Sequence, residues 1–184
     1  VKGLTGIFGF FPEEDAKNSE IVVPYLSSGG LGLPDRDYYF DEDKEEIRQK
    51  YKIYLNKLYE MYYGKENLEK VNNVYDIQEK FAKKIFTRVE KRNPEKNYNK
   101  MMIHELKSRY NLDWDSFFGI LTRNLEISYV IVDNPEYFTE FTNLWLNVDL
   151  DTWKDYLKLK LLSSTASYLS DDYVNLKFNF FNKT

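Results

Sequence analysis

Apolar residues in the first half of the chain recur at intervals of three and four, and this spacing constrains the fold more than any other feature of the sequence. Two runs show it, one over positions 41–63 and one over 68–91, with Gly64 between them as a helix stop signal. The runs therefore predict a long antiparallel helix hairpin over 41–92. The apolar seams are Ile47, Tyr51, Tyr54, Leu55, Leu58, Met61 and Tyr62, then Val71, Val74, Ile77, Gln78, Phe81, Ile85 and Val89.

The acidic start of the first run has two interpretations. Asp43 suits a helix N-cap, with Glu46 three residues later as its reciprocal partner. A calcium-binding loop starting at Asp41 would need a glycine where Glu46 stands and an acid where Lys52 stands. The sequence therefore favours a helix start over a calcium site.

Shorter helices are predicted over 93–184, after Pro94 ends the second run. Their expected spans are 100–110, 113–124, a helix from 135, 152–169 and a last helix from 171. The expected caps are Asn99, Asp113, Asn134 and Asp151. Residues 127–132 are rich in β-branched side chains and predict a short strand or a buried extended link.

Residues 1–40 predict an extended or looped lead-in, rich in glycine, that lays its aromatic residues into a groove. A turn is expected at Pro12–Asp15 and one short strand at Ile21–Val23, with no obvious partner strand. The fold class that follows is all-α, mainly helical, with antiparallel helix pairs, an irregular N-terminal segment and one or two short strands. The 184 residues fit a single helical domain, 1–184.

Composition excludes several classes of function. A net charge of -4 gives no basic face for nucleic acid, and the absence of cysteine removes disulfides and thiolate metal sites. No apolar run approaches the roughly 20 residues of a membrane helix. We therefore expect a soluble protein, and the missing cysteines favour a bacterial cytoplasmic or exported one.

The least generic stretch of the chain is its glycine-rich segment, which runs from Gly30 through Gly32 and Pro34 to Tyr39. Local spacing is compatible with a plain connecting loop. A dinucleotide fingerprint would need a third glycine and a following helix, whereas Pro34 and Asp35 follow here. The segment therefore predicts no phosphate cradle.

This segment resembles the glycine-rich segment of the neprilysin and oligopeptidase O family of zinc endopeptidases. Three later segments resemble the same family in the same order: 87–101, 132–138 and 152–158. The resemblance implies the N-terminal, non-catalytic part of such an enzyme, a cap lobe with a lead-in over 1–40, a helix hairpin over 41–92 and shorter helices over 93–184. The family motif residues are Gly30, Gly32, Pro34, Asp35, Arg36, Asp37, Tyr38 and Tyr39.

The chemistry of a zinc peptidase is missing from the sequence. Such enzymes need His-Glu-x-x-His on one helix. His104-Glu105 begins this motif, but Ser108 stands where the second histidine belongs. We therefore assign no catalytic, cofactor-binding or metal-binding residue to this chain, and His104 is interpreted as a surface or packing residue.

Two functions remain open. In the first, the resemblance implies an inactive cap that shapes and restricts access to the catalytic chamber of a zinc metalloendopeptidase. Its partners would be the catalytic lobe of the same protein and, for the parent enzyme, oligopeptide substrates, with zinc held outside this fragment. In the second, the chain is a stand-alone helical module that binds a peptide or protein without peptidase activity.

Overall fold

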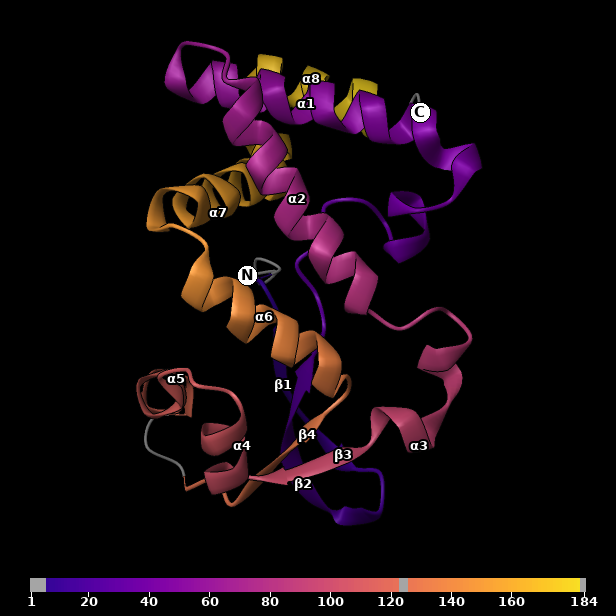
Figure 1. Cartoon of the computed structure of the whole chain (residues 1–184), viewed down its shortest axis with the longest axis vertical. Coiled ribbons are helices and arrows are strands. Elements are labelled where there is room, and N and C mark those ends of the chain that lie inside the picture. Colours follow the sequence, from indigo (N-terminus) through magenta and orange to yellow (C-terminus); the bar gives the residue numbers. More distant parts are fainter. Residues whose placement is uncertain (1–5, 123–125, 183–184) are drawn as a thin grey trace. The chain divides into compact units, whose positions relative to one another are not determined.

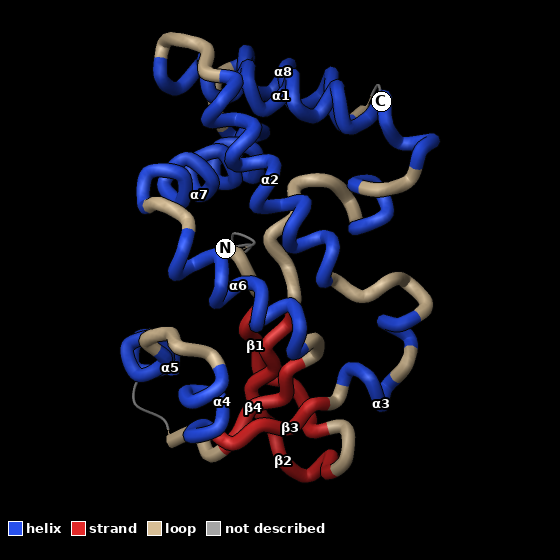
Figure 2. The backbone as a smooth tube through the Cα atoms, viewed as in Figure 1, coloured by secondary structure: helices blue, strands red, loops and turns tan. Residues whose placement is uncertain are grey.

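The structure is a computed structural model that describes residues 6–122 and 126–182. Its described residues divide into two compact units. The helical unit contains residues 31–83 and 147–182, and the sheet unit contains residues 6–30 and 84–146. Helices predominate over strands, which confirms the mainly helical fold class (Figure 2). No helix among the described residues is long and apolar enough to cross a membrane.

The helical unit is built on α1 (Glu45–Tyr63), which packs against α8 (Asp171–Phe181) and α7 (Leu150–Thr165). Figure 1 shows α8 running beside α1 in the opposite direction. The rings of Tyr54 and Phe180 stack with centroids 5.0 Å apart. Burial of these aromatic faces stabilises the pair. The unit also contains α2 (Leu68–Lys84, except its last residue) and 3-10 turns at Arg36–Tyr39, Glu42–Lys44 and Ala166–Tyr168.

Two predicted helix starts in this unit are wrong by a few residues. Asp43 lies inside the 3-10 turn that precedes α1, and its carboxylate pairs with Lys44 at 2.6 Å instead of capping the helix. α7 begins at Leu150 because Asp149, not Asp151, accepts the Thr152 amide hydrogen. The predicted stop at Gly64 is confirmed, with φ of 74° at the end of α1.

α2 ends at Lys84, seven residues before the predicted end. The cause is a reciprocal cap just beyond it, in the sheet unit. The Thr87 amide donates to the Glu90 carboxylate at 2.9 Å, and the Glu90 amide donates to the Thr87 hydroxyl at 3.2 Å. This capping box starts a new 3-10 turn (Glu90–Arg92). The helix is therefore interrupted, although the apolar period of the sequence continues to Val89.

The sheet unit contains a four-stranded sheet in the order β1-β2-β4-β3. Its strands are β1 (Gly9–Asp15), β2 (Asn18–Ser27), β3 (Asn99–Met102) and β4 (Tyr129–Val132). β1 and β2 form an antiparallel hairpin, β2 lies parallel to β4, and β3 is antiparallel to β4. The strands predicted at Ile21–Val23 and within 127–132 are confirmed.

Three expectations for this region are wrong. Pro12–Asp15 is part of β1, and the chain turns between Asp15 and Asn18 instead. Ile21–Val23 has a partner strand after all, because β1 lies beside it. Asn99 begins a strand and not a helix. In each case the pairing partner lies outside the local sequence, or in a hairpin whose turn carries no glycine signal.

The helices of the sheet unit are α3 (Pro94–Asn97), α4 (Ile103–Arg109), α5 (Trp114–Thr122) and α6 (Pro135–Asn147, except its last residue). The predicted end of α5 at Asn124 lies outside the described residues. Pro94 does not end the second helix as predicted, because α2 already ends at Lys84; instead it starts α3, with Asn93 as its cap. The predicted caps Asp113 and Asn134 are confirmed, because they accept the amide hydrogens of Ser116 and Tyr137.

An aromatic cluster forms the core of the sheet unit. The ring of Phe8 lies between 5.4 and 6.1 Å, centroid to centroid, from four other rings. Such tilted and edge-on pairs add to the burial of apolar area. The N-terminal lead-in is therefore fixed to α5 and α6 by its first aromatic residue. The four rings belong to Trp114, Phe117, Phe138 and Phe141.

Candidate functional site

The glycine-rich segment begins in the sheet unit and continues in the helical unit. At its start, the Ser28 amide donates to both carboxylate oxygens of Asp133 at 3.0 Å. Gly30 has φ of 82°, a left-handed conformation that favours glycine. The segment thus leaves β2 through a turn that a side chain would strain.

A buried polar centre holds the second part of this segment. The Oε1 atom of Gln78, on α2, accepts hydrogen bonds from the hydroxyls of Tyr39 (2.8 Å) and Tyr51 (2.9 Å) and from the Gly32 amide (3.0 Å). Burial raises the pKa of both phenols, so they stay neutral and donate. We call these four residues the Gln78 centre. It ties the segment to α1 and α2.

The acidic and basic residues of the motif are also used locally. Asp35 accepts the Asp37 amide hydrogen at 3.0 Å and caps the first 3-10 turn. Arg36 donates through Nε to the carbonyl of Ala82 at 3.3 Å. The carbonyl of Tyr38 accepts from Arg48 of α1 at 3.1 Å. Each of these contacts anchors a loop, and none presents a reactive group to a cavity.

Lys160 of α7 also contacts the segment. Its ammonium donates to the carbonyl of Leu31 at 3.0 Å. Burial lowers the pKa of this amine to about 8. The lysine therefore binds a loop carbonyl while its charge is disfavoured by the surroundings.

A buried carboxylate lies in 152–158, the last of the four segments that resemble the family. Asp155 of α7 accepts from the Tyr63 hydroxyl at 2.5 Å and pairs with Lys70 at 3.0 Å. Lys158 in turn donates to the Tyr63 hydroxyl at 2.9 Å. The carboxylate is therefore compensated by neighbours on α1 and α2, as a buried charge must be.

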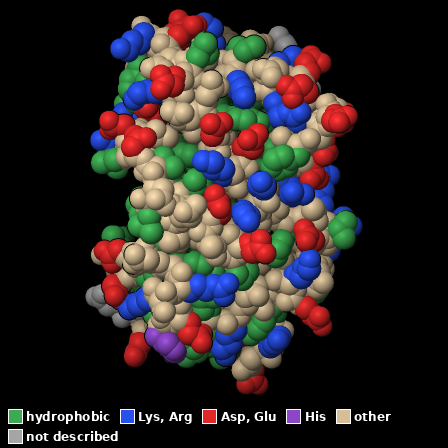
Figure 3. Space-filling view, in the orientation of Figure 1, with side chains coloured by type: hydrophobic (Ala, Val, Ile, Leu, Met, Phe, Trp, Pro, Cys, Tyr) green, Lys and Arg blue, Asp and Glu red, His purple; other side chains and the backbone are tan. Residues whose placement is uncertain are grey.

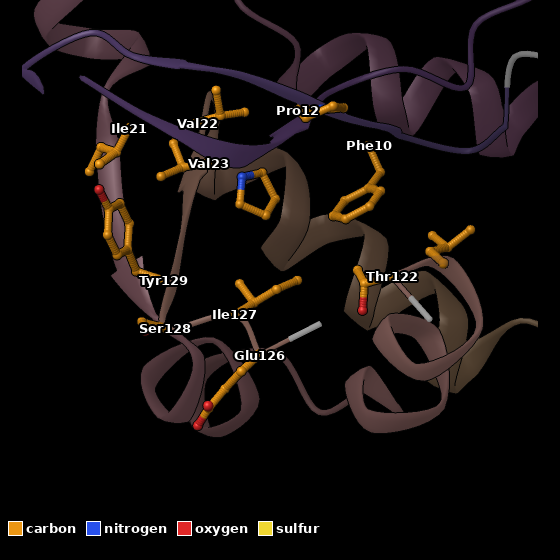
Figure 4. Close-up of a pocket in the computed structure, with 12 residues that line it drawn as sticks. Phe10, Pro12, Ile21, Val22, Val23, Thr122, Glu126, Ile127, Ser128 and Tyr129 are labelled. Carbon is orange, nitrogen blue, oxygen red and sulfur yellow. The ribbon is translucent and has the colours of Figure 1, made fainter. Parts of the chain in front are cut away.

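An apolar groove of about 530 Å³ lies in the sheet unit. Figure 4 shows Phe10, Val23 and Ile127 around its interior, whereas Glu126 points away from it. β1 and β2 form one wall, and the end of α5 with residues 126–129 forms the other. The lining residues are Phe10, Pro12, Ile21, Val22, Val23, Pro24, Leu121, Thr122, Glu126, Ile127, Ser128 and Tyr129.

Two of the polar side chains that line this groove have partners elsewhere. The hydroxyl of Tyr129 donates to Asp15 at 2.6 Å, and this hydrogen bond raises the pKa of Tyr129 to about 12. Thr122 donates to the carbonyl of Phe118. The groove can therefore hold an apolar group, and its described lining offers no poised acid, base or nucleophile. Sequence analysis missed the groove because its walls come from segments about 100 residues apart.

His104, which the sequence predicted to be a surface or packing residue, lies exposed on α4. Its neighbour Glu105 accepts the Met102 amide hydrogen at 2.8 Å and so caps the helix. Ser108, where a second histidine would be needed, is exposed as well. Within residues 6–122 and 126–182, no three His, Cys, Asp or Glu side chains are grouped to hold a metal ion.

Charged side chains of both signs are spread over the face shown in Figure 3. This distribution agrees with the near balance of 26 basic and 30 acidic residues. A nucleic-acid site would need a cluster of Lys and Arg.

Two relatives are similar to this chain along most of its length. The endothelin-converting enzyme homolog of Locusta migratoria is 27% identical over 181 residues, which cover 91% of this chain and 25% of that protein. Neprilysin-1 of Caenorhabditis elegans is 27% identical and is matched over 97% of this chain and 26% of its own length. The chain thus spans about a quarter of the length of these relatives.

Two solved structures share the fold. The zinc metalloprotease Zmp1 of Mycobacterium tuberculosis has a TM-score of 0.91 at 23% identity, covering 98% of this chain and 28% of that one. PepO of Lactobacillus rhamnosis has a TM-score of 0.76 at 15% identity, covering 96% and 29%. The model of peptidase family M13 matches residues 2–184. The resemblance noted in the sequence is confirmed by these matches, and the chain belongs to peptidase family M13, in its N-terminal part.

Proposed function

We propose that this chain is the non-catalytic cap of an M13 zinc metalloendopeptidase that hydrolyses oligopeptides. The cap shapes the catalytic chamber and restricts which substrates enter it. The observation that carries the proposal is the family match over residues 2–184, in a chain that spans about a quarter of its relatives. The zinc and its ligands then belong to another part of the parent protein, and the catalytic lobe is the partner of this chain.

The internal contacts of the chain support this role. Its polar motif residues anchor loops and helices, and its aromatic residues fill two cores. A part that acts by exclusion needs stable, well-packed surfaces more than reactive groups. The Gln78 centre supplies that stability in the helical unit. The aromatic cluster around Phe8 supplies it in the sheet unit.

The test has two parts. The purified chain is dialysed against zinc, its metal content is measured, and it is incubated with fluorogenic peptides. We expect no zinc above the content of a His104→Ala control and no cleavage. Zinc bound at one equivalent together with peptide cleavage by the pure chain would refute the proposal.

The second part uses the longer M13 polypeptide that carries the chain. Its rate of cleavage is measured on a series from short peptides to folded proteins. We expect cleavage to fall sharply once the substrate is a folded domain. Equal cleavage of peptides and folded proteins would remove the access-restricting role, even if the family assignment stands.

A further inference from the structure

The last helix of the chain, α8, has three distinct faces. At 100° per residue, Tyr173, Leu176 and Phe180 share one face, and Phe180 is buried against Tyr51 and Tyr54 of α1. Asparagines form a second face, at positions 175, 179 and 182. The third face carries Val174, Phe178 and Phe181, which follow one another at intervals of four and three. We call this third face the α8 stripe.

The α8 stripe is apolar and partly exposed, and of its residues Phe181 also contacts the ring of Tyr54 on α1 edge-on, at 5.6 Å between centroids. The exposed fractions are 36% for Val174, 50% for Phe178 and 42% for Phe181. A helix that faces solvent on one side normally carries polar residues there, as the asparagine face of α8 does. The same helix therefore presents a face suited to water and, next to it, a face suited to a protein surface.

We propose that the α8 stripe is an interface, covered in the intact protein by an apolar surface of the M13 polypeptide outside residues 1–184. This inference rests on the proposed function and adds to it the surface through which the cap meets the rest of its own protein. The relatives support the choice of occupant, because about three quarters of their length lies outside the region that this chain matches.

The area of the stripe argues against a second copy of the chain as the occupant. An aromatic side chain buries roughly 200 Å² when fully covered, so the stripe offers on the order of 250 Å². A stable interface between separate proteins needs about 800 Å² from each partner. A covalently connected partner does not face this threshold, because the linkage supplies an effective concentration near the millimolar range.

The experiment uses the absence of cysteine from the chain. Val174→Cys places a single thiol on the α8 stripe, and Asn175→Cys places one on the asparagine face of the same helix. The rate of maleimide labelling is measured for both variants, in the chain alone and in the longer M13 polypeptide, with any native cysteines of that polypeptide replaced. Phe178→Cys serves as a second probe of the stripe, and circular dichroism checks that each variant is folded.

We expect Val174→Cys and Asn175→Cys to react at similar rates in the chain alone. In the longer polypeptide, labelling of Val174→Cys and Phe178→Cys should slow by about tenfold or more, while Asn175→Cys stays reactive. Equal reactivity of stripe and control positions in the longer polypeptide would overturn the proposal. Protection that already occurs in the chain alone and grows with its concentration would overturn it too, in favour of a second copy.

These results are separable from a failure of the proposed function. If the longer polypeptide cleaves peptides while the α8 stripe labels freely, only the interface is wrong. If the stripe is protected and the polypeptide cleaves nothing, the interface stands and the peptidase role falls.

Discussion

Gly32 lies directly against the hydroxyl group of Tyr51. A Cβ atom built on this glycine would overlap that hydroxyl and lie 2.8 Å from Oε1 of Gln78. The glycine is therefore required by close approach, and its φ is not in the left-handed region that Gly30 occupies. The family motif thus places two glycines two residues apart for two different physical reasons.

Replacing Gly32 by alanine should destabilise the protein by about 2–4 kcal/mol, because the new methyl group displaces Tyr51 and breaks the Gln78 centre. Urea denaturation measures the loss. The matched control is Gly119→Ala in α5, where nothing lies within 4 Å of the added Cβ. The control should gain about 0.5–1 kcal/mol from helix propensity. Equal effects of the two variants would contradict the close approach.

Replacing Gln78 by leucine should cost about 2–4 kcal/mol, because the two buried hydroxyls of Tyr39 and Tyr51 lose their shared acceptor and the half-buried Gly32 amide loses one of its two. The control is Asn72→Leu, at an exposed position of the same helix, which should change stability by less than about 0.5 kcal/mol. Chemical denaturation compares the two. A small effect at Gln78 would mean that Tyr39 and Tyr51 find other acceptors.

Lys160 should make stability rise with pH in the alkaline range. Its pKa is about 8 in the folded protein and near the ordinary 10.5 in the unfolded chain. Below pH 8 both states are charged, so the folded state bears the cost of a partly buried ammonium. Between about pH 8 and 10.5 the folded state loses its proton first, so stability rises, by on the order of 1–2 kcal/mol.

Urea denaturation at pH 7.5 and 9.5 tests this behaviour. Lys160→Met should be more stable than the native sequence at pH 7.5 and should lose the rise toward pH 9.5. Lys154→Met, at an exposed position of the same helix, should keep it. A rise that survives in Lys160→Met must come from another group.

Glu90 should titrate far below the ordinary carboxyl range. Hydrogen bonds from the Thr87 amide, Lys96 and the Thr87 hydroxyl lower the pKa of Glu90 to about 2. The stabilisation that this carboxylate gives is therefore present above its ordinary value of 4.5 and is lost as the pH falls toward 2.

An NMR titration of the side-chain carboxyl gives the pKa of Glu90 directly. Thr87→Ala removes the hydroxyl, which donates to the Glu90 carboxylate and accepts the Glu90 amide hydrogen, but it keeps the Thr87 amide donor. The pKa of Glu90 should therefore rise part of the way toward 4.5. Thr139→Ala, whose hydroxyl donates to the carbonyl of Pro135 on another helix, should leave it unchanged. An unshifted Glu90 in the native chain would mean that the capping box does not form in solution.

Local signals in the sequence determined most of the helices. The period of three and four located α1 and the body of α2, and Gly64 ended α1 as predicted. The caps Asp113 and Asn134 were also visible in the sequence, because a capping side chain acts within three residues of its own position. The family resemblance lies in such local segments, which is why it was visible before the fold.

Tertiary structure alone decided the sheet, the groove and the Gln78 centre. β2 lies beside β4 although about 100 residues separate them, and no local pattern specifies that pairing. Gln78 occupies a position in the apolar seam of α2, so periodicity assigned it to the core. Its role came from Gly32, Tyr39 and Tyr51, which reach it from two other segments. A buried polar group needs partners, and only the folded chain determines which residues supply them.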